Sequence, residues 1–373
     1  MSLSLKEVRT RRELRQFITF PEKLYKNCPN WVPSLHGDEF DALGDKNPAL
    51  DFCERALYLA LRDGQIVGRV AAIINHNTNA RWQEKVVRFG WIDFIEDIEV
   101  VRLLIDAVVR WGKERDCVKI KGPLGFSDMD KEGLLVEGFE YLSPFTVIYN
   151  YPYYGPMLEQ LGFVKDADWT QKIVDIPEGD LPQLKSASLV EERLGLHVLK
   201  CVSMRELGMK YGKELFHVVN ASFSELYEFA PLTDRQIDVY VKVYMPILNK
   251  DFVAVILDKD EQVAGFAFCV PTLSRAFQKA KGRLFPFGFI PILRALHNTD
   301  TIEALMIGVL PQYQGEGASV LMFKHLLDSC HKYGVKRMLT NPQLETNDKV
   351  QSIFKGITGT RVFQRRRSYV KAI

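Results

Sequence analysis

The sequence lacks the usual signs of a secreted, metal-binding or membrane-spanning protein. Its six cysteines are widely scattered and include no Cys-x-x-Cys pair, which argues against a zinc site and against a disulfide framework. No segment approaches the roughly eighteen consecutive apolar residues of a membrane-spanning helix, and the first residues lack the apolar core of a signal peptide. We therefore predict a cytoplasmic protein with no bound metal and no integral membrane segment.

The sequence also lacks a strong charge of either sign. Its 49 lysines and arginines and its 47 aspartates and glutamates give a net charge of +2, so the composition predicts neither a nucleic-acid partner nor an anionic membrane. Three arginines at 365–367 do not change this prediction, because successive strand residues point to opposite faces. We expect these arginines to be solvated or ion-paired at a sheet edge. The length of 373 residues favours two domains and leaves the oligomeric state open.

The most informative stretch is a predicted strand, a glycine turn and a helix near the C-terminus. Residues 301–310 are rich in β-branched and apolar side chains, and Pro311 cannot continue a sheet because it has no N–H. Apolar residues recur every three or four positions over residues 320–333, which predicts an amphipathic helix. Gly315 and Gly317 lie between the strand and the helix. The unpaired N–H groups and the dipole of a helix start favour an anion, so we expect a phosphate or pyrophosphate there.

The glycine spacing separates this turn from two common nucleotide-binding motifs. Neither Gly-x-Gly-x-x-Gly nor the P-loop pattern is present. The pattern that is present, Gln312-x-x-Gly315-x-Gly317-Ala318, resembles the pyrophosphate loop of the GCN5-related N-acetyltransferases, the GNAT superfamily. The other interpretation is a turn that uses glycine for close packing alone.

The resemblance implies where acetyl-CoA, or another acyl-CoA, would bind. In the family the loop amides hold the pyrophosphate, and two N–H groups of the preceding strand pair with the pantetheine and polarise the thioester. The family's asparagine after the fifth strand matches Asn347. Seven residues later, where the family often has a tyrosine that protonates the departing thiolate, this chain has Phe354, so either Tyr313 or water supplies the proton, or the thiolate leaves unprotonated, or transfer is slow. The implied cofactor-binding residues are Ile307, Val309, Gln312, Gln314, Gly315, Glu316, Gly317, Ala318, Ser319, Asn347 and Phe354.

Two carboxylates are candidates for the general base. An alkylamine acceptor with a pKa of about 10.4 is mostly protonated at neutral pH, so a base is useful for its acylation. Glu303 lies on the strand that leads into the loop, where the family often has a catalytic carboxylate, and Glu345 lies at the end of the fifth strand. The structural alternative for Glu303 is a surface or interdomain carboxylate.

Both halves of the chain show the same predicted order of elements, β-α-β-β-β-α-β-α-β, which resembles that of the GNAT superfamily. Proline, glycine and charged residues at 177–183 predict a domain boundary near residue 183. We expect an α/β (α+β) protein with two tandem GNAT-like domains, residues 1–183 and 184–373, each a mixed, mostly antiparallel twisted sheet flanked by helices. The first half has Glu96, Asp97 and Glu99 and no glycine at the position of the loop, and carboxylates repel a pyrophosphate. We therefore predict a degenerate first domain and CoA binding by the second.

Two further segments have both a functional and a structural interpretation. Residues 122–139 are dense in glycine and carboxylates, so they either recognise an amine across the domain interface or form a long, solvated turn. Residues 282–293 contain three phenylalanines and two prolines. They either pack between the domains, or wall a substrate tunnel or touch a membrane surface.

The leading functional prediction is an acyl-CoA-dependent N-acyltransferase, most simply an N-acetyltransferase, that acts on a small amine or amino-acid-like acceptor near the domain interface. The chain also resembles a bacterial branch of the superfamily that shares Trp31-Val32-Pro33, Gly133-Leu134-Leu135-Val136 and Tyr153-Tyr154. A second hypothesis is a catalytically silent CoA-binding sensor or scaffold, which Phe354 favours. A third is a Fem-like aminoacyl transferase that uses charged tRNA, and the near-zero net charge argues against it.

Overall fold

The structure is a computed structural model that describes residues 2–179, 181–245, 248–353 and 357–373, so Phe354 lies outside the described residues. The first half contains β1 (Leu3–Glu7), α1 (Arg11–Leu24), α2 (His36–Leu43), β2 (Cys53–Arg62), β3 (Gln65–Asn75), α3 (His76–Trp82), β4 (Val86–Phe94), α4 (Ile98–Lys113), β5 (Lys119–Gly122), β6 (Leu134–Glu137), α5 (Tyr154–Gln160) and β7 (Val164–Asp175). The second half contains α6 (Ala187–Leu194), β8 (His197–Val198), α7 (Met204–Ser222), α8 (Asp234–Tyr244), β9 (Val253–Leu257), β10 (Val263–Pro271), α9 (Ser274–Ala280), α10 (Phe289–His297), β11 (Thr301–Val309), α11 (Ala318–Tyr333), β12 (Arg337–Leu339), β13 (Gln343–Leu344), α12 (Asp348–Ile353) and β14 (Arg361–Ala372).

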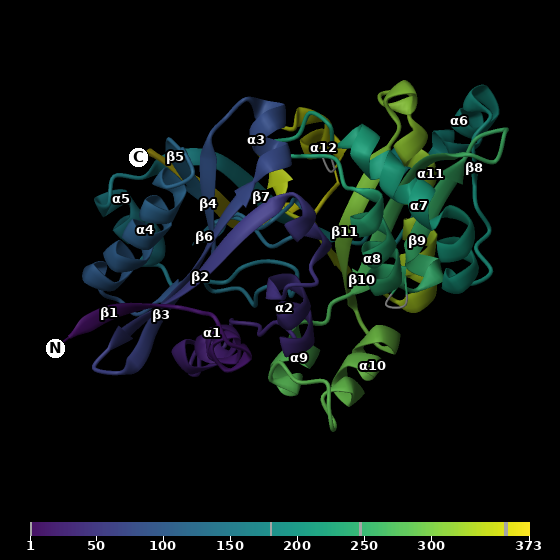
Figure 1. The fold of residues 1–373 in the computed structure, drawn as a ribbon. Helices are drawn as coiled ribbons and strands as arrows, with labels where there is room; N and C mark the ends of the chain where they lie inside the picture. Colours follow the sequence, from purple (N-terminus) through teal and green to yellow (C-terminus); the bar gives the residue numbers. More distant parts are fainter. Residues whose placement is uncertain (1, 180, 246–247, 354–356) are drawn as a thin grey trace.

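Each half is a sheet with helices on both faces (Figure 1). In the first half, α4 and α5 cover one face of the sheet and α1 and α2 cover the other. In the second half, α6 and α11 pack on one face, and α7 and α8 pack on the other. Among the described strands, the pairs β4–β5 and β11–β12 are parallel and the other pairs are antiparallel. These observations confirm the predicted mixed, mostly antiparallel sheets flanked by helices.

Local sequence signals explain the best-predicted elements. Asp63 and Gly64 have φ angles of 48° and 80° and join β2 to β3 in a two-residue turn, as the Asp-Gly step predicts. In the first half, Asp97 caps the N-terminus of α4, because its Oδ1 atom accepts a hydrogen bond from the N–H of Glu99 (2.9 Å). The helix start that corresponds to the predicted CoA loop is thus capped by the protein's own carboxylate.

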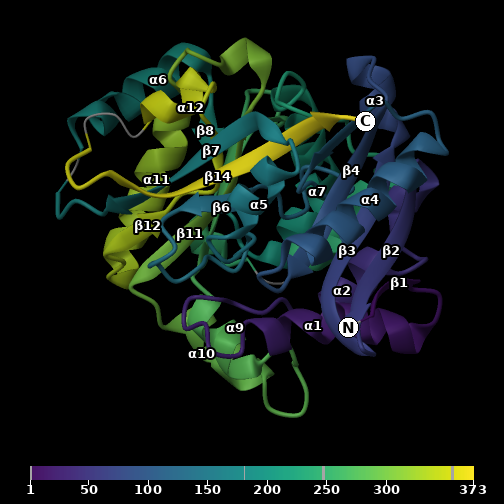
Figure 2. The same ribbon diagram turned by 90° about the vertical axis from the view of Figure 1, so that its left-hand side faces the viewer.

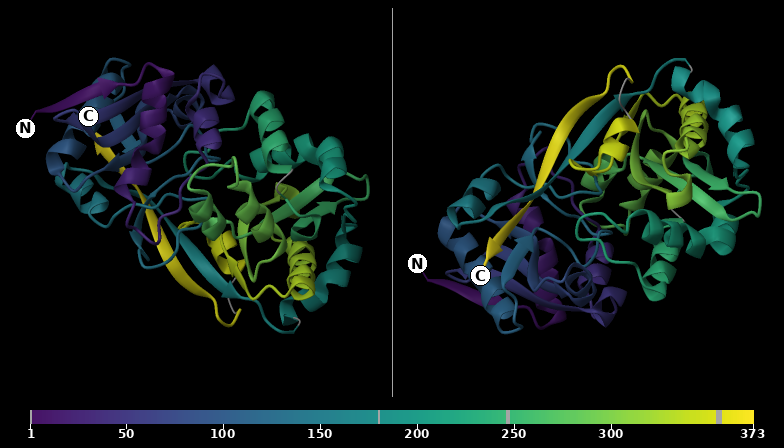
Figure 3. Two further views of the ribbon diagram at one scale, coloured as in Figure 1. Left: turned by 90° about the horizontal axis from the view of Figure 1, so that it is seen from below. Right: turned by 90° about the horizontal axis from the view of Figure 1, so that it is seen from above.

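The last strand of each half pairs with the sheet of the other half. The described strands form one 14-stranded sheet in the order β1-β2-β3-β4-β5-β14-β7-β12-β11-β10-β9-β8, with β6 on β14 and β13 on β7. The last strand of the chain, β14, pairs with β5 of the first half, where Ala372 lies opposite Lys119. The last strand of the first half, β7, pairs with β12 of the second half, where Asp175 lies opposite Arg337. Figure 3 shows β14 crossing from the second half to the C-terminus beside the first half.

The exchange places β14 in the middle of the sheet, so the predicted edge position of the arginines at 365–367 is wrong. Arg366 is fully buried, and its Nε donates to Oε1 of Gln171 (2.7 Å). Arg367 donates two hydrogen bonds to Asp168 (2.8 and 3.0 Å). These arginines are therefore structural residues between two strands. The predicted boundary near residue 183 stays a prediction.

The segment that follows α7 also ties the two halves together. Glu228 forms ion pairs with Arg88 (2.8 Å) and Lys121 (2.7 Å) of the first half, and all three side chains are buried. The indole Nε1 of Trp82 donates to the carbonyl oxygen of Phe229 (3.1 Å). Removal of one partner from such a buried ion pair leaves an uncompensated charge, which is strongly destabilising. The Arg88–Glu228–Lys121 cluster therefore helps to fix the relative position of the halves.

We expect deletion of β14 to loosen the sheet of the first half. A chain that ends at residue 360 leaves β5 without one of its two neighbours. We expect the amides of Lys119–Gly122 to exchange hydrogen at least about tenfold faster than in the full chain. Hydrogen exchange with mass spectrometry measures this rate. Deletion of residues 1–7 removes the edge strand β1 and is the control, which should leave β5 protected; equal protection of β5 in all three chains would contradict the exchanged pairing.

Candidate active site

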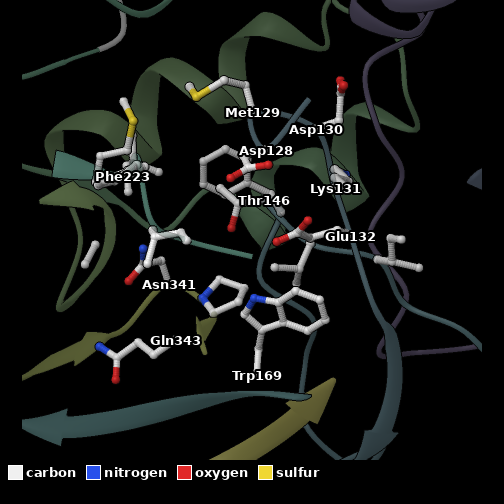
Figure 4. A pocket seen from close by; sticks show the side chains of 18 of the residues that line it. Asp128, Met129, Asp130, Lys131, Glu132, Thr146, Trp169, Phe223, Asn341 and Gln343 are labelled. Carbon is white, nitrogen blue, oxygen red and sulfur yellow. The ribbon is translucent and has the colours of Figure 1, made fainter. Parts of the chain in front are cut away.

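A cavity of about 1970 Å³ lies between the two halves. Its first-half wall comes from the connection between α1 and α2, from residues 128–132 and 145–149, and from Trp169 of β7. Its second-half wall comes from the end of α7, from β11, from the loop into α11 and from the segment before α12. Figure 4 shows side chains from both halves that point into this space. The cavity therefore depends on the strand exchange and on the contacts around Glu228.

Strand β11 presents an unpaired edge to the cavity. It pairs with β12 only from Thr301 to Glu303 among the described residues, and Ala304 to Val309 line the cavity. A register shift opposite Phe268 and Cys269 leaves Leu305 without a partner on β10, so β11 contains a bulge. The N–H of Leu310 donates to Ala264 on β10 (2.9 Å). Because the hydrogen-bonded pairs of an antiparallel ladder alternate, the N–H groups of Ile307 and Val309 point away from β10, towards the open side.

The glycine loop leads from this edge into α11. Gly315 and Gly317 have φ angles of 80° and 88°, in the left-handed region that favours glycine. Gly317 is the N-cap of α11 and has no side chain to satisfy the first N–H groups of this 16-residue helix. Gly315, Gly317, Ala318 and Ser319 line the cavity. An open helix start with small residues is a suitable site for a phosphate group.

Two predicted loop residues are engaged by the protein itself, and a third does not line the cavity. The N–H of Gln314 donates to the carbonyl oxygen of Pro311 (3.2 Å), and its side-chain Nε2 donates to that of Val309 (3.0 Å). Glu316 points away from the cavity and pairs with Arg193 of α6 (3.2 Å). Gln312 is exposed and is not among the cavity-lining residues. The loop amides that remain as anion donors therefore begin at Gly315, one residue later than predicted.

Asn347 lines the cavity beside the loop. Its Oδ1 atom accepts a hydrogen bond from the N–H of Val350 (3.3 Å), so the side chain also orders the start of α12. The next predicted position along the chain, Phe354, has no described placement. Tyr313, the alternative proton donor, lines the cavity at the loop and is half-buried.

Glu303 is buried beneath the cavity floor and is not among the lining residues. Thr272 donates a hydrogen bond to its Oε1 atom (2.5 Å), while its buried Oε2 atom has no hydrogen-bond partner among the described residues. Burial raises the pKa of Glu303 to about 7. Glu303 therefore has a pKa suited to a base but no direct access to the cavity.

The residues on either side of Glu345 line the cavity, whereas Glu345 itself faces away from it. It pairs with Lys165 of β7 (3.0 Å) and Arg365 of β14 (3.1 Å), and is not itself a lining residue. Hydrogen bonds from Lys165 and then Arg365 lower its pKa. A carboxylate held in its charged form by two cations is a weak base, so the geometry favours a structural role that links the exchanged strands.

The loop at 128–132 brings two other carboxylates into the cavity. Asp128 and Glu132 point towards the same space as Thr146, with Asn341 and Trp169 on the opposite side (Figure 4). Neither carboxylate has a hydrogen bond or an ion pair with another side chain in the described ranges. Sequence analysis singled out this segment for its density of glycine and carboxylates, but could not tell which side chains face the cavity.

The surroundings keep these carboxylates partly protonated. The pKa of Asp128 is raised to about 7, chiefly by burial; Arg88 opposes this shift and the nearby Glu228 adds to it. Burial, followed by repulsion from Asp128, raises the pKa of Glu132 well above its usual range. Two close carboxyl groups do not both ionise readily. At neutral pH the pair can accept one proton and also bind a cation, which are the two properties that an amine site requires.

Comparison with solved structures identifies the fold. No model of a protein family matches the sequence. A tandem GNAT protein from the clavulanic acid biosynthesis pathway superposes with a TM-score of 0.57 at 11% identity, over 100% of this chain and 98% of its own. A GCN5-related N-acetyltransferase from Anabaena variabilis gives a TM-score of 0.52 at 8% identity, over 99% and 72% of the two chains. The chain therefore has a tandem GNAT fold.

Two proteins are similar in sequence over both halves. Protein YghO of Escherichia coli (strain K12) is 28% identical over 374 residues, which cover 97% of this chain and 94% of its own. The bacterial ceramide synthase of Caulobacter vibrioides is 29% identical over 384 residues, which cover 100% and 98%. Among the described residues, no helix has the length and apolar character needed to cross a bilayer.

Substitution of Gly315 by alanine tests whether the loop binds CoA, and a second glycine with a similar backbone conformation serves as the control. Gly315 and Gly334 both have positive φ angles (80° and 67°), and a Cβ at either position would meet no atom within 4 Å. Alanine at each therefore costs about 1 kcal/mol through backbone strain alone. We expect Gly315→Ala to weaken CoA binding at least about tenfold, because the loop amides shift, and Gly334→Ala, at the far end of α11, to leave it unchanged. Calorimetric titration with CoA measures both; equal losses would assign the effect to strain.

The buried Glu303 predicts a pH-dependent stability. Its pKa rises from the ordinary 4.5 to about 7 in the fold, so the fold favours the neutral form and loses stability as pH rises through this window. We expect Glu303→Gln, which resembles the neutral form, to be about 3 kcal/mol more stable than the natural chain at pH 8 and less than about 1 kcal/mol more stable at pH 5. Urea unfolding at the two pH values measures this difference. A constant difference would contradict the raised pKa.

Proposed function

We propose that the protein is an acyl-CoA-dependent N-acyltransferase that acts on a lipid-like amine bound between the two halves. The observation that carries the proposal is the meeting of three features in one cavity. The first feature is the glycine loop with the open edge of β11. The second is the pair of carboxylates in the 128–132 loop that have no side-chain partner among the described residues. The third is an apolar wall that leads from this pair to the α9–α10 insertion. Acetyl-CoA and longer acyl-CoA esters are both candidate donors.

The second half provides the features that suit the CoA ester. The open start of α11 suits the pyrophosphate, and the N–H groups of Ile307 and Val309 face the side on which pantetheine would run. Arg193 lies beside the loop, where its Nη2 atom donates to the carbonyl oxygen of Glu316 and its guanidinium pairs with the Glu316 carboxylate, which holds the loop backbone in place. The capped start of α4 in the first half lacks these features. We therefore assign the CoA ester to the second half alone.

The loop at 128–132 supplies the features that suit an amine. A protonated amine can pair with Asp128 and Glu132, which lack a side-chain partner in the described parts of the chain. The ionised carboxylate takes one proton, and the neutral nitrogen then attacks the thioester carbon. The C–S bond breaks as the amide forms. The thiolate of CoA takes a proton from Tyr313 or water, and the second proton that the nitrogen loses on forming the amide replaces it. A base with a pKa near the working pH is effective in such a step.

The size and character of the cavity favour a larger acceptor than the small amine that the sequence predicted. Sites for drug-sized ligands are typically about 300–1,000 Å³, and this cavity of about 1970 Å³ can hold both a CoA ester and a long acceptor. Its wall near α9 contains Val32, Leu35, Phe145, Leu273 and Phe277. The similarity to a bacterial ceramide synthase over both halves supports an amine with a long alkyl chain.

A silent CoA sensor is the second candidate function. The observation that favours it is the engagement of Gln314 and Glu316 by the protein itself, which leaves fewer loop donors than predicted. Tight binding of CoA without release of free thiol from any acyl-CoA and amine pair would support the sensor. Turnover that needs charged tRNA and no CoA would instead support the Fem-like transferase.

A paired screen tests the proposed reaction. Acetyl-, octanoyl- and palmitoyl-CoA are each combined with short polar amines and with long-chain amino alcohols, and free thiol release and amide mass are recorded. We expect turnover with long-chain amines to exceed turnover with short ones. No amide product with any pair would remove the transferase proposal.

The same assay identifies the base. We expect Asp128→Asn to lower kcat by at least about 10²-fold and to abolish the rise of kcat with pH through about 7, because the variant has no proton-accepting group at that position. Glu303→Gln and Glu345→Gln test the two residues that the sequence favoured. The control is Asp328→Asn, which removes a surface ion pair with Lys324 on α11 (2.7 Å) and should leave kcat unchanged. A large loss in Glu303→Gln or Glu345→Gln, with Asp128→Asn active, would overturn the assignment.

A further inference from the structure

The insertion between β10 and β11 forms a protruding apolar tip. Helices α9 and α10 project away from the sheet in Figures 1 and 2, and residues 281–288 connect them at the end of the projection. Phe285 and Phe287 are 78% and 72% exposed, and Leu284, Phe289 and Leu293 are also exposed. These five side chains are a large share of the exposed large apolar side chains of the described chain, and they lie within ten residues. We call residues 281–293 the apolar tip.

Packing between the halves explains only the α10 end of the apolar tip, where Ile292 joins the cluster of Val32 and Leu35, and leaves its phenylalanines exposed. Helix α10 has no fully buried residue. The polar contacts that anchor the insertion to the first half are made by Gln278 and by Gly282, at the start of the tip. Gln278 donates to the carbonyl oxygens of Pro29 and Trp31 (both 2.8 Å), and the N–H of His36 donates to the carbonyl oxygen of Gly282 (2.8 Å). The insertion is therefore held rigidly against the first half while its phenylalanines face outward.

The charge around the apolar tip has one sign. From Pro271 to Thr299 the sequence contains five lysines and arginines and no aspartate or glutamate. All five are exposed, and none forms an ion pair within the described residues. They are Arg275, Lys279, Lys281, Arg283 and Arg294. Arg15 of α1 lines the same small hollow as Arg283, which extends the positive surface onto the first half. This local excess is hidden in a net charge of +2 for the whole chain.

The apolar tip is continuous with the cavity. Leu284, which is exposed on the tip, also lines the cavity, and so does Ile292 of α10. Ile292 packs on Leu273 and Phe277, and these belong to the apolar wall of the cavity. An apolar path therefore runs from the outer surface of the tip to the space between the halves.

We propose that the apolar tip docks on the surface of an anionic lipid bilayer. Exposed phenylalanine and leucine side chains beside unpaired lysines and arginines are the combination that binds an interface, because apolar side chains enter the acyl boundary while cations contact anionic headgroups. Each basic residue near such a surface adds attraction, and salt screens it. A protein partner would need a complementary acidic face and a matching apolar pocket, whereas a bilayer supplies both features over any area. The inference concerns a partner and does not depend on the reaction proposed for the cavity.

Vesicle co-sedimentation of the full chain tests this surface. The probes are vesicles of phosphatidylcholine alone and of phosphatidylcholine with about one third phosphatidylglycerol, at low and at high salt. We expect binding to the anionic vesicles that weakens with salt. We expect the double variant Phe285→Ser, Phe287→Ser to lower the partition coefficient at least about tenfold, and Lys281→Glu with Arg283→Glu to lower it by a similar factor on anionic vesicles.

The matched control is the double variant Val202→Ser, Met209→Ser. These side chains are 72% and 73% exposed and lie outside the α9–α10 insertion, before and within α7, so their loss should leave vesicle binding unchanged. Melting temperatures confirm that the variants fold, and the charge variant replaces the phenylalanine variant if the latter does not. Absence of binding by the natural chain, or equal binding by all variants, would overturn the proposal. Conversion of a dimer to a monomer by the phenylalanine variant would show that a second copy covers the tip instead.

Discussion

Each half of the sheet is completed by a strand from the other half, and the cavity depends on this exchange. Strand β7 lies between β14 and β12, so it carries Trp169 from the first half to the wall opposite the 128–132 loop. Strand β12 pairs with β11 over three residues only, and the chain then continues into β13, which pairs with β7. The open edge of β11, which faces the thioester in the proposed function, is thus maintained by a strand of the first half. Neither half could keep this geometry alone.

Buried ion pairs hold the other wall of the cavity in place. The Arg88–Glu228–Lys121 cluster joins the halves, and Arg88 also donates to the carbonyl oxygen of Gly125, three residues before the 128–132 loop (3.1 Å). The same Arg88 lowers the pKa of Asp128, while the buried Glu228 raises it. The residues that hold the halves together therefore also set the protonation of the carboxylates. In the proposed function, binding of an amine there would therefore be coupled to the integrity of the interface.

Local features of the fold could be predicted from the sequence, and pairing between distant segments could not. The hairpin at Asp63, the strand before Pro311 and the turn at Gly315 and Gly317 depend on backbone preferences of neighbouring residues. A strand has the same pattern whichever sheet it joins, so the exchange of β7 and β14 left no signal. Glu345 illustrates the consequence, because its partners Lys165 and Arg365 lie on those two strands. The density of carboxylates at 128–132 was visible, whereas the direction of each side chain depends on the other half.

The proposed reaction and the proposed membrane contact use opposite ends of one strand. The α9–α10 insertion enters β11 at Thr301, and the glycine loop leaves it after Val309, so about 25–30 Å of strand separates the two. A water-soluble CoA ester can therefore approach the start of α11 while an amphiphilic amine enters past Leu284 from a bilayer. The carboxylates of the 128–132 loop line the cavity that both routes reach, where the amine headgroup would meet the thioester. This arrangement removes the need to bring a long alkyl chain through water, a cost of about 0.8 kcal/mol for each CH₂ group.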